Sequence, residues 1–492
     1  MTILVGPPCD QGVAHSCAPR RDLAGRRREV LAATILGSSL AFTDGAVVNV
    51  ALPGLQSALG ASAAVVQWVM NAYLLMLGAL VLVGGAAADR FGRKRIFIAG
   101  IALFAMASLA CAAAPTAPLL VAARALQGIG AALLTPASLA LLGAAFSEAE
   151  RPRAFSIWAG AGALTTALGP LLGGWLVDTV GWRAIFLINL PIAALAIFIV
   201  RAVPESGDDE APALDVPGAV SAALALGALT YGLTLATETG WTRWTCAWIV
   251  SGAVLFAGFL LIERRSDTPM LPLGLFRSRA FATLNGMTFL VYFALGGTLF
   301  LLPFELIRFE GYTATQAGAA LLPFALVMGV FSSAAARLAS RIGDRVQLAA
   351  GPLIAGAGIA WLGVADIVGS FWTVRLPPLL VMAIGMTLTV GPLTAAVMNA
   401  VVVRHAGLAS GVNNAVARVA GLIAVATMAL TVAMVESTGV GPAPDILAAM
   451  DRDAFHRGFE VAMIVAAACA ALGGAWIGIA LTPASQAIKT QE

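Results

Sequence analysis

Two charged residues, Asp44 and Arg124, lie inside long apolar stretches of the sequence, and the carboxylate of Asp44 could bind and release a proton. Asp44 belongs to TDGAVVNVALP (43–53), and burying a carboxylate there is costly unless it is paired, hydrated or protonated. Arg124 belongs to LLVAARALQGIGAA (119–132); it keeps its proton and needs a carboxylate or carbonyl groups around it. Asp44 is its leading candidate partner, and a change in their separation would couple proton release to movement. The alternative is an ion pair that only joins two helices.

A short charged segment, GGAAADRFGRKR (84–95), lies between two long apolar stretches. Gly85 and its neighbour Gly84 allow close helix approach, and Gly92 supplies a tight turn. Asp89 can accept hydrogen bonds or meet a helix N-terminus, which we expect near Ser410. By the positive-inside rule, four basic residues place the segment in the cytoplasm: Arg90, Arg93, Lys94 and Arg95.

A third pattern, GAGALTTALGPLLGG (160–174), collects small residues at near-helical spacing. Small residues let helices approach closely, and a proline bends a helix because it removes a backbone hydrogen bond. The residues of interest are Gly169, Pro170, Gly173 and Gly174. On its own, the pattern indicates only tight helix packing.

The composition predicts an integral membrane protein made of helices. The 492 residues are 60% hydrophobic and 11% charged, with a mean hydropathy of +0.90, which is more apolar surface than a soluble core could bury. The net charge of +3 is small and implies no nucleic-acid partner. The five cysteines are scattered and the three histidines fall outside the predicted spans, so neither a disulfide framework nor a metal site is expected. The sequence contains no HExxH or phosphate-binding Gly loop, and we do not expect an enzyme.

Charged residues, Pro and Gly divide the chain into fourteen predicted spans. Their approximate bounds are 30–52, 66–88, 96–114, 119–143, 154–177, 183–203, 216–236, 244–262, 280–304, 314–337, 346–365, 375–402, 409–435 and 459–481. Twenty-one of the 29 Lys and Arg residues then fall in predicted inner segments and six in outer ones. Both terminal tails, 1–29 and 482–492, are therefore predicted to be cytoplasmic.

A weak internal sequence repeat, here called the internal echo, divides these spans into two halves. RLASRIGDRV (337–346) repeats AAADRFGRKR (86–95), with Gly343 in the place of Gly92. The echo follows the tenth predicted span, where a six-plus-six repeat interrupted by two extra helices would place it. The predicted parts are a six-helix bundle at 30–203, an inserted helix pair with linkers at 204–279, and a second six-helix bundle at 280–481.

These motifs resemble those of the major facilitator superfamily. The 84–95 segment is similar to its loop between helices 2 and 3, and LLVAARALQGIGAA is similar to its fourth-helix pattern of Arg, Gln and two glycines. TDGAVVNVALP resembles the first-helix motif of the fourteen-helix drug:proton antiporters, with Phe42 and Gly45 as departures. Further similarities to the antiporters are found at 160–174, 181–191, 311–323 and 407–421.

The resemblance implies an all-α major facilitator fold and export of hydrophobic or cationic small molecules by alternating access. A proton gradient across the plasma (inner) membrane would drive it, with no cofactor, and Asp44 and Arg124 would couple the proton. A proton symporter or facilitator for a metabolite is the alternative. The expected partners are the substrate, protons and the lipid bilayer; the expected state is a functional monomer, with a periplasmic adaptor as a further candidate partner. The candidate substrate-cavity residues are Asn49, Gln67, Asn71, Tyr73, Gln127, Asn285, Tyr292 and Arg418.

One segment, FELIRFEG (304–311), departs from the family pattern. The family usually has an aromatic residue and a Gln at about the places of Glu305 and Ile307, so the resemblance does not carry a substrate specificity to this chain. Glu305 is either a second acidic site or an outer-surface partner of Arg308, and the sequence favours the second interpretation.

Overall fold

A computed structural model describes residues 25–147, 150–207, 213–365, 370–401, 406–437 and 452–480, and every regular element in these ranges is a helix. The first part of the chain forms α3 (Arg27–Leu59), α4 (Ala63–Phe91), α5 (Arg93–Ala113), α6 (Ala117–Ala145), α7 (Arg151–Thr179), α8 (Ala184–Leu187) and α9 (Asn189–Val200). The middle part forms α10 (Val216–Thr239), α11 (Arg243–Arg265) and the 3₁₀ helix η1 (Leu273–Arg277). The last part forms α12 (Arg279–Phe304), the π-helix η2 (Glu305–Phe309), α13 (Ala314–Ile342), α14 (Asp344–Val364), α15 (Phe371–Val374), α16 (Leu376–Asn399), α17 (Ala406–Ser437) and α19 (Arg452–Ala480).

Thirteen of the described helices are long and apolar enough to cross a membrane. The sixth predicted span, 183–203, instead forms a shorter apolar segment, Ala184–Val200, which α8 and α9 share. The predicted count of fourteen therefore stays a prediction. The expectation that no histidine lies within a span is wrong, because α19 begins before residue 459 and includes His456.

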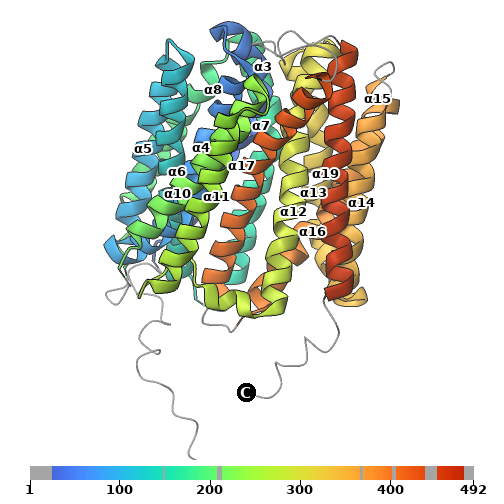
Figure 1. Cartoon of the computed structure of the whole chain (residues 1–492). Helices are drawn as coiled ribbons and strands as arrows, with labels where there is room; N and C mark the ends of the chain where they lie inside the picture. Colours follow the sequence, from blue (N-terminus) through green and yellow to red (C-terminus); the bar gives the residue numbers. More distant parts are fainter. Residues whose placement is uncertain are drawn as a thin grey trace, which may run out of the picture.

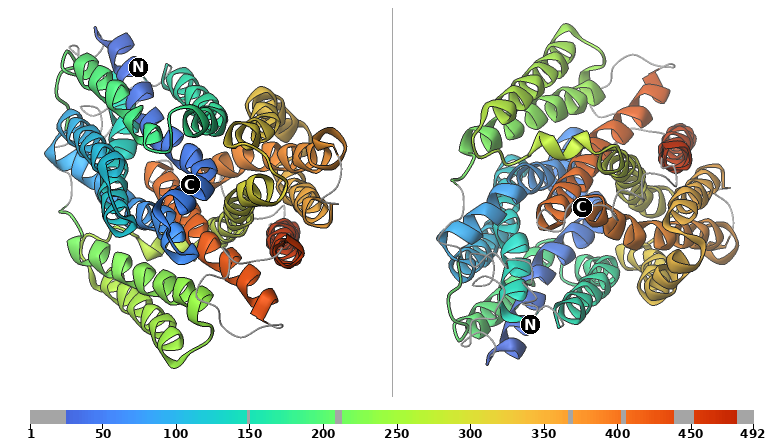
Figure 2. Two further views of the ribbon diagram at one scale, coloured as in Figure 1. Left: turned by 90° about the horizontal axis from the view of Figure 1, so that it is seen from above. Right: turned by 90° about the horizontal axis from the view of Figure 1, so that it is seen from below.

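The helices run roughly side by side in two groups (Figure 1). Helices α3–α9 gather on one side and α12–α19 on the other, and both views of Figure 2 show α10 and α11 together at the edge of the bundle. The α10–α11 pair is attached by an apolar cluster of Leu75 from α4, Leu226 from α10 and Leu422 from α17. We call the end of the bundle with the 84–95 segment the loop side, and the opposite end, where α8 and α15 lie, the far side (Figure 1).

The largest apolar core that the two halves share lies toward the far side. Val47 and Leu55, in the far-side part of α3, belong to the same buried cluster as Phe300 of α12 and Ala314 of α13. Toward the loop side, the first half has a core of its own, which contains Val30, Leu40 and Phe97. Because burial of apolar surface holds helices together, the shared core joins the halves at the far side. Helices α4 and α17 also touch nearer the loop side, where a Cβ at Gly411 would lie 3.2 Å from Leu82 Cδ2.

The internal echo is confirmed at the backbone level. Gly92 separates α4 from α5 with a φ of +104°, and Gly343 separates α13 from α14 with a φ of +87°. Residues with a side chain rarely adopt such angles, so both glycines are required by the turn. The two halves thus use the same sharp connection at the same place in their helix order.

Candidate functional site

Asp44 and Arg124 form a buried ion pair at the centre of the first half. Arg124 Nη1 on α6 donates to Asp44 Oδ2 on α3 over 2.5 Å, and the two side chains are 0% and 1% exposed. Arg124 Nε also donates to the Val69 carbonyl oxygen of α4 over 2.9 Å. The predicted pairing is therefore confirmed, and the guanidinium links three helices.

Gln127, one helical turn after Arg124, extends this pair into a network. Its Oε1 accepts from Arg124 Nη1 over 2.6 Å, and its Nε2 donates to Asp44 Oδ1 over 2.9 Å. The same Nε2 lies 2.9 Å from the Ser108 hydroxyl of α5, which also accepts from Asn189 of α9 over 3.3 Å. Both oxygens of Asp44 thus receive a hydrogen-bond donor.

Aromatic rings cover the guanidinium of Arg124. Its Cζ lies 4.3 Å from the centroid of the Tyr73 ring and 6.0 Å from that of Phe186. A cation above a ring face is attracted by the ring's π electrons. Arg124 Nη2 is buried and has no hydrogen-bond partner among the described residues, so one donor of this site is unused.

The other predicted cavity residues on α3 and α4 lie near this network without joining it. Asn49 is half-buried, and its Nδ2 donates to the Gly45 carbonyl of its own helix over 3.3 Å. Gln67 and Asn71 are 0% exposed, and the amide atoms of both lack partners within the described chain. An unpaired buried amide is costly. These two amides are available to a ligand or to a rearrangement of α4.

The predicted cavity residues of the second half lie on α12 and α17. Asn285 is buried, and its Oδ1 accepts from Nδ2 of Asn413, which also donates to the Thr288 hydroxyl over 2.6 Å. Arg418 lies across from Gly78 of α4, because a Cβ added at Gly78 would lie 3.5 Å from Arg418 Cβ. Arg418 therefore lies where the two halves meet, and Tyr292 is half-buried on α12. Sequence reasoning missed Ser108 and Asn413, because a single Ser or Asn in an apolar helix gives no signal of its partners.

The small-residue pattern of α7 packs against two different helices. A Cβ atom added at Gly169 would lie 2.8 Å from Ala46 Cβ, and one at Gly173 would lie 2.7 Å from Val47 Cγ1, so these glycines face α3 beside Asp44. Gly174 and Pro170 face α13: a Cβ at Gly174 would overlap the Ala314 carbonyl, and one at Gly318 would overlap the Pro170 carbonyl. Helix α7 therefore connects the helix that carries Asp44 with the opposite half.

The far-side contact between the halves also has a polar part. The carboxylate of Asp178, near the end of α7, accepts from the backbone N–H groups of Ala314 and Thr315 over 3.2 and 2.7 Å. Both belong to the first turn of α13, where a carboxylate is stabilised by the helix dipole. Sequence reasoning did not single out Asp178.

The carboxylate of Asp89 pairs with Arg93 within its own segment, over 2.9 Å to Nε and 2.8 Å to Nη2. This conformation does not show the expected contact between Asp89 and the N-terminal end of α17 near Ser410. Since the halves are joined at the far side here, that contact stays a prediction for the opposite conformation. Gly84 does allow close approach, because a Cβ there would overlap the Ala132 carbonyl of α6; Arg90 is exposed on the loop side.

Glu205, in the linker after α9, caps the N-terminal end of α5. Its two oxygens accept from the backbone N–H groups of Lys94 and Arg95 over 2.9 and 3.1 Å. We expect Glu205→Ala to destabilise the protein by about 1 kcal/mol, because these helix-end donors lose their acceptor. The melting temperature of the purified protein should fall, whereas Asp267→Ala, at an exposed position, should leave it unchanged. Equal melting temperatures for Glu205→Ala and the unmodified protein would contradict this role.

Glu305 is not an outer-surface residue, and the preferred interpretation of the sequence is wrong on this point. The residue is 0% exposed, and its Oε1 lies 3.5 Å from Arg375 Nη2 and 3.0 Å from His456 Nδ1. Glu305 is the first residue of η2, and its partners lie at the start of α16 and on α19. Arg308, one turn later, donates to Gln56 of α3 over 3.3 Å.

Comparison with known proteins agrees with this geometry. Residues 34–425 match the model of the Major Facilitator Superfamily. The chain is 37% identical to the multidrug resistance protein Stp of Mycobacterium tuberculosis, over 78% of this chain and 72% of that protein. It is 37% identical to the methylenomycin A resistance protein of Bacillus subtilis (81% and 86% covered) and 35% identical to the puromycin resistance protein of Streptomyces alboniger (90% and 88% covered).

Solved structures support the fold. A crystal structure of a D-xylose–proton symporter superposes with a TM-score of 0.66 at 16% identity and covers 93% of this chain and 98% of the symporter. At this identity the similarity concerns the fold alone. The family match, the related resistance proteins and the shared fold together lead to one assignment: the chain belongs to the major facilitator superfamily, in the branch of its drug:proton antiporters.

Proposed function

We propose that this protein exports small molecules across the plasma (inner) membrane in exchange for protons. The observation that carries the proposal is the buried Asp44–Arg124–Gln127 network, because Asp44 is an ionisable group deep in the first half. The antiporter pattern of α7 supports export, since it packs beside Asp44 and against the opposite half at once. The antibiotic and multidrug resistance proteins among the relatives support small, hydrophobic or cationic substrates.

The cycle follows from the state of the ion pair. While Arg124 touches Asp44, the carboxylate is ionised; when they separate, Asp44 takes up a proton, because a lone buried charge is costly. Binding of substrate favours the ionised form, and return from the acidic outer side favours the protonated form. Arg418, Tyr292 and the unpaired amides of Gln67 and Asn71 are the candidate substrate contacts between the halves.

The arrangement in the membrane is part of the proposal. The loop side faces the cytoplasm together with both termini, because the basic residues of 84–95 lie there. The rocking units are the bundles at 30–203 and 280–481, and the pair at 204–279 is an insertion at the edge. We further propose a functional monomer, with a periplasmic adaptor as a candidate partner, and no cofactor beyond the proton gradient.

Efflux is tested with the purified full chain in liposomes. We expect an imposed pH gradient to drive accumulation of a resistance-type compound, such as puromycin or ethidium, against its own gradient. Sensitivity of a deletion strain to a panel of toxic compounds selects the compound for the assay. Inward, proton-accompanied movement of the compound would contradict export and favour a symporter. Movement that ignores the pH gradient would favour a facilitator.

A further inference from the structure

A second group of buried charges lies in the other half, at the far side. Glu305 of η2 contacts both Arg375, at the start of α16, and His456 of α19. Arg375 also pairs closely with Glu310 and donates from Nη1 to the Leu362 carbonyl over 3.2 Å. The side chains of Glu305 and Arg375 are 0% and 2% exposed, so water does not screen their charges.

Glu305 has only a weak hold on the guanidinium of this cluster. Arg375 pairs more closely with Glu310 and lies 3.5 Å from Glu305, so it compensates the charge of the buried Glu305 only in part. In a buried site an uncompensated charge is unfavourable. One proton, on His456 or on Glu305, would compensate the charge of Glu305.

Two atoms show where this proton can reside. Glu305 Oε2 is buried and has no hydrogen-bond partner among the described residues, although Oε1 of the same carboxylate has two. A proton on that oxygen would remove the charge that is left unpaired there. The imidazole of His456 is 21% exposed, more than the carboxylates and the guanidinium, so it is the member of the cluster that water reaches.

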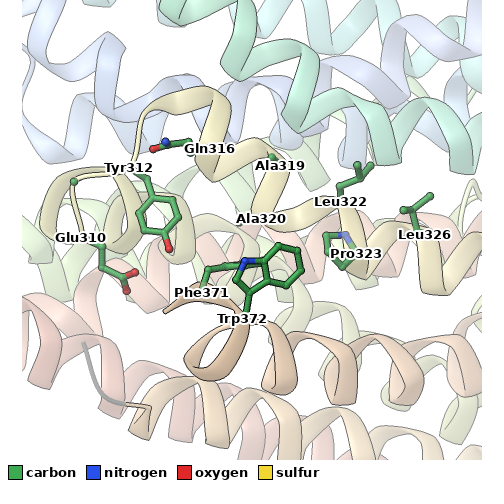
Figure 3. A pocket seen from close by; sticks show the side chains of 11 residues that line it. Glu310, Tyr312, Gln316, Ala319, Ala320, Leu322, Pro323, Leu326, Phe371 and Trp372 are labelled. Carbon is green, nitrogen blue, oxygen red and sulfur yellow. The ribbon is translucent and has the colours of Figure 1, made fainter. Parts of the chain in front are cut away.

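Other charged and titratable groups lie around the cluster. Arg308 of η2 points to Gln56, and Tyr312 follows Glu310 in the loop before α13. On α19, Asp453 and Arg457 are exposed and Glu460 is half-buried. A cavity of about 660 Å³ extends from Glu310 and Tyr312 past Trp372 to Leu326, as Figure 3 shows, so open space reaches the carboxylate that holds Arg375.

We propose that Glu305 and His456 form a second proton-binding site, separate from Asp44, which takes its proton from the far side. The site lies in the segment that joins the halves at that side. Arg308 contacts α3 one turn after Glu305, and the α13 end held by Asp178 begins six residues after Arg308. A proton bound at this site therefore changes the charge next to the far-side contact. The role of this site in transport rests on the proposed proton-driven efflux, whereas proton binding by Glu305 and His456 can be detected without transport.

Infrared difference spectroscopy of the purified full-length protein, recorded while the pH is lowered, tests the proposal. The C=O band of a carboxylic acid appears when a carboxylate takes up a proton. We expect a component of this band to be lost in Glu305→Gln and kept in both Asp44→Asn and Glu310→Gln. Spectra of Glu305→Gln that coincide with those of the unmodified protein, or loss of the component in Glu310→Gln instead, would overturn the assignment.

The variant His456→Gln keeps a side-chain donor for Glu305 but cannot take up a proton. We expect it to retain the Glu305 component, but at a pH shifted by about one unit, because the neighbouring charge no longer titrates. An unshifted component would show that His456 takes no part. Because these spectra need neither substrate nor transport, a failed efflux assay would reject the proposed function and leave this result standing.

Discussion

Replacing Asp44 with Asn is expected to reduce proton-driven uphill efflux to the level of empty liposomes. The amide cannot bind and release a proton, so the protein is held in the neutral state of this position. Substrate binding and downhill exchange should persist, since Gln67, Asn71 and Arg418 are unchanged. Transport into liposomes with and without an imposed pH gradient separates these two activities.

The same substitution also has a cost in stability. Asn offers one acceptor oxygen where Asp44 offers two, so it cannot serve both Arg124 and Gln127 as they are placed. Breaking one side of a buried ion pair typically costs about 3–5 kcal/mol. The amount of folded protein must therefore be matched between variants before transport rates are compared.

Ser57→Ala is the matched control, because Ser57 is exposed on the same helix and bonds only to its own backbone in this structure. We expect this variant to retain proton-driven efflux. Continued accumulation of substrate against its gradient by Asp44→Asn would show that the coupling proton travels elsewhere, and Glu305 is then the residue to test.

Much of the fold and the central ion pair could be predicted from the sequence. The apolar stretches are long enough to cross a membrane, and the glycines at 92 and 343 mark the same turn in both halves. Asp44 and Arg124 stand out because charges are rare in such stretches and each requires a partner. Their pairing follows from this requirement, without knowledge of the helix arrangement.

The surroundings of the ion pair and the far-side charges could not be predicted in the same way. Which Ser, Asn or Gln meets Asp44 depends on the rotation and depth of each helix, and neither is encoded by a short motif. Glu305 was misplaced because the predicted span ends at 304, whereas the helical segment continues through η2 and Glu305 is buried in it. The partner Arg375 lies 70 residues away in sequence, beyond any local pattern.

Gly174→Ala is expected to reduce efflux about tenfold or more by destabilising the conformation closed at the far side. An added Cβ would overlap the Ala314 carbonyl and lie 2.7 Å from Thr315 Cα, both of which are backbone atoms. They cannot move aside easily, because Asp178 holds the same helix end through its backbone N–H groups. Overpacking of this kind costs about 1–3 kcal/mol, and each 1.4 kcal/mol changes a conformational population about tenfold.

Spin labels at Val180 and Trp372, which are exposed at the far side of opposite halves, report this change directly. In a background in which all five native cysteines are replaced, the distance distribution of Gly174→Ala should shift to longer values as its efflux falls. Gly160→Ala is the control on the same helix, because nothing lies within 4 Å of the added Cβ. If Gly174→Ala kept the short distances but lost efflux, the glycine would serve the transport step in another way than by closing the far side. If it kept both, the close approach of α7 and α13 would have no part in the cycle.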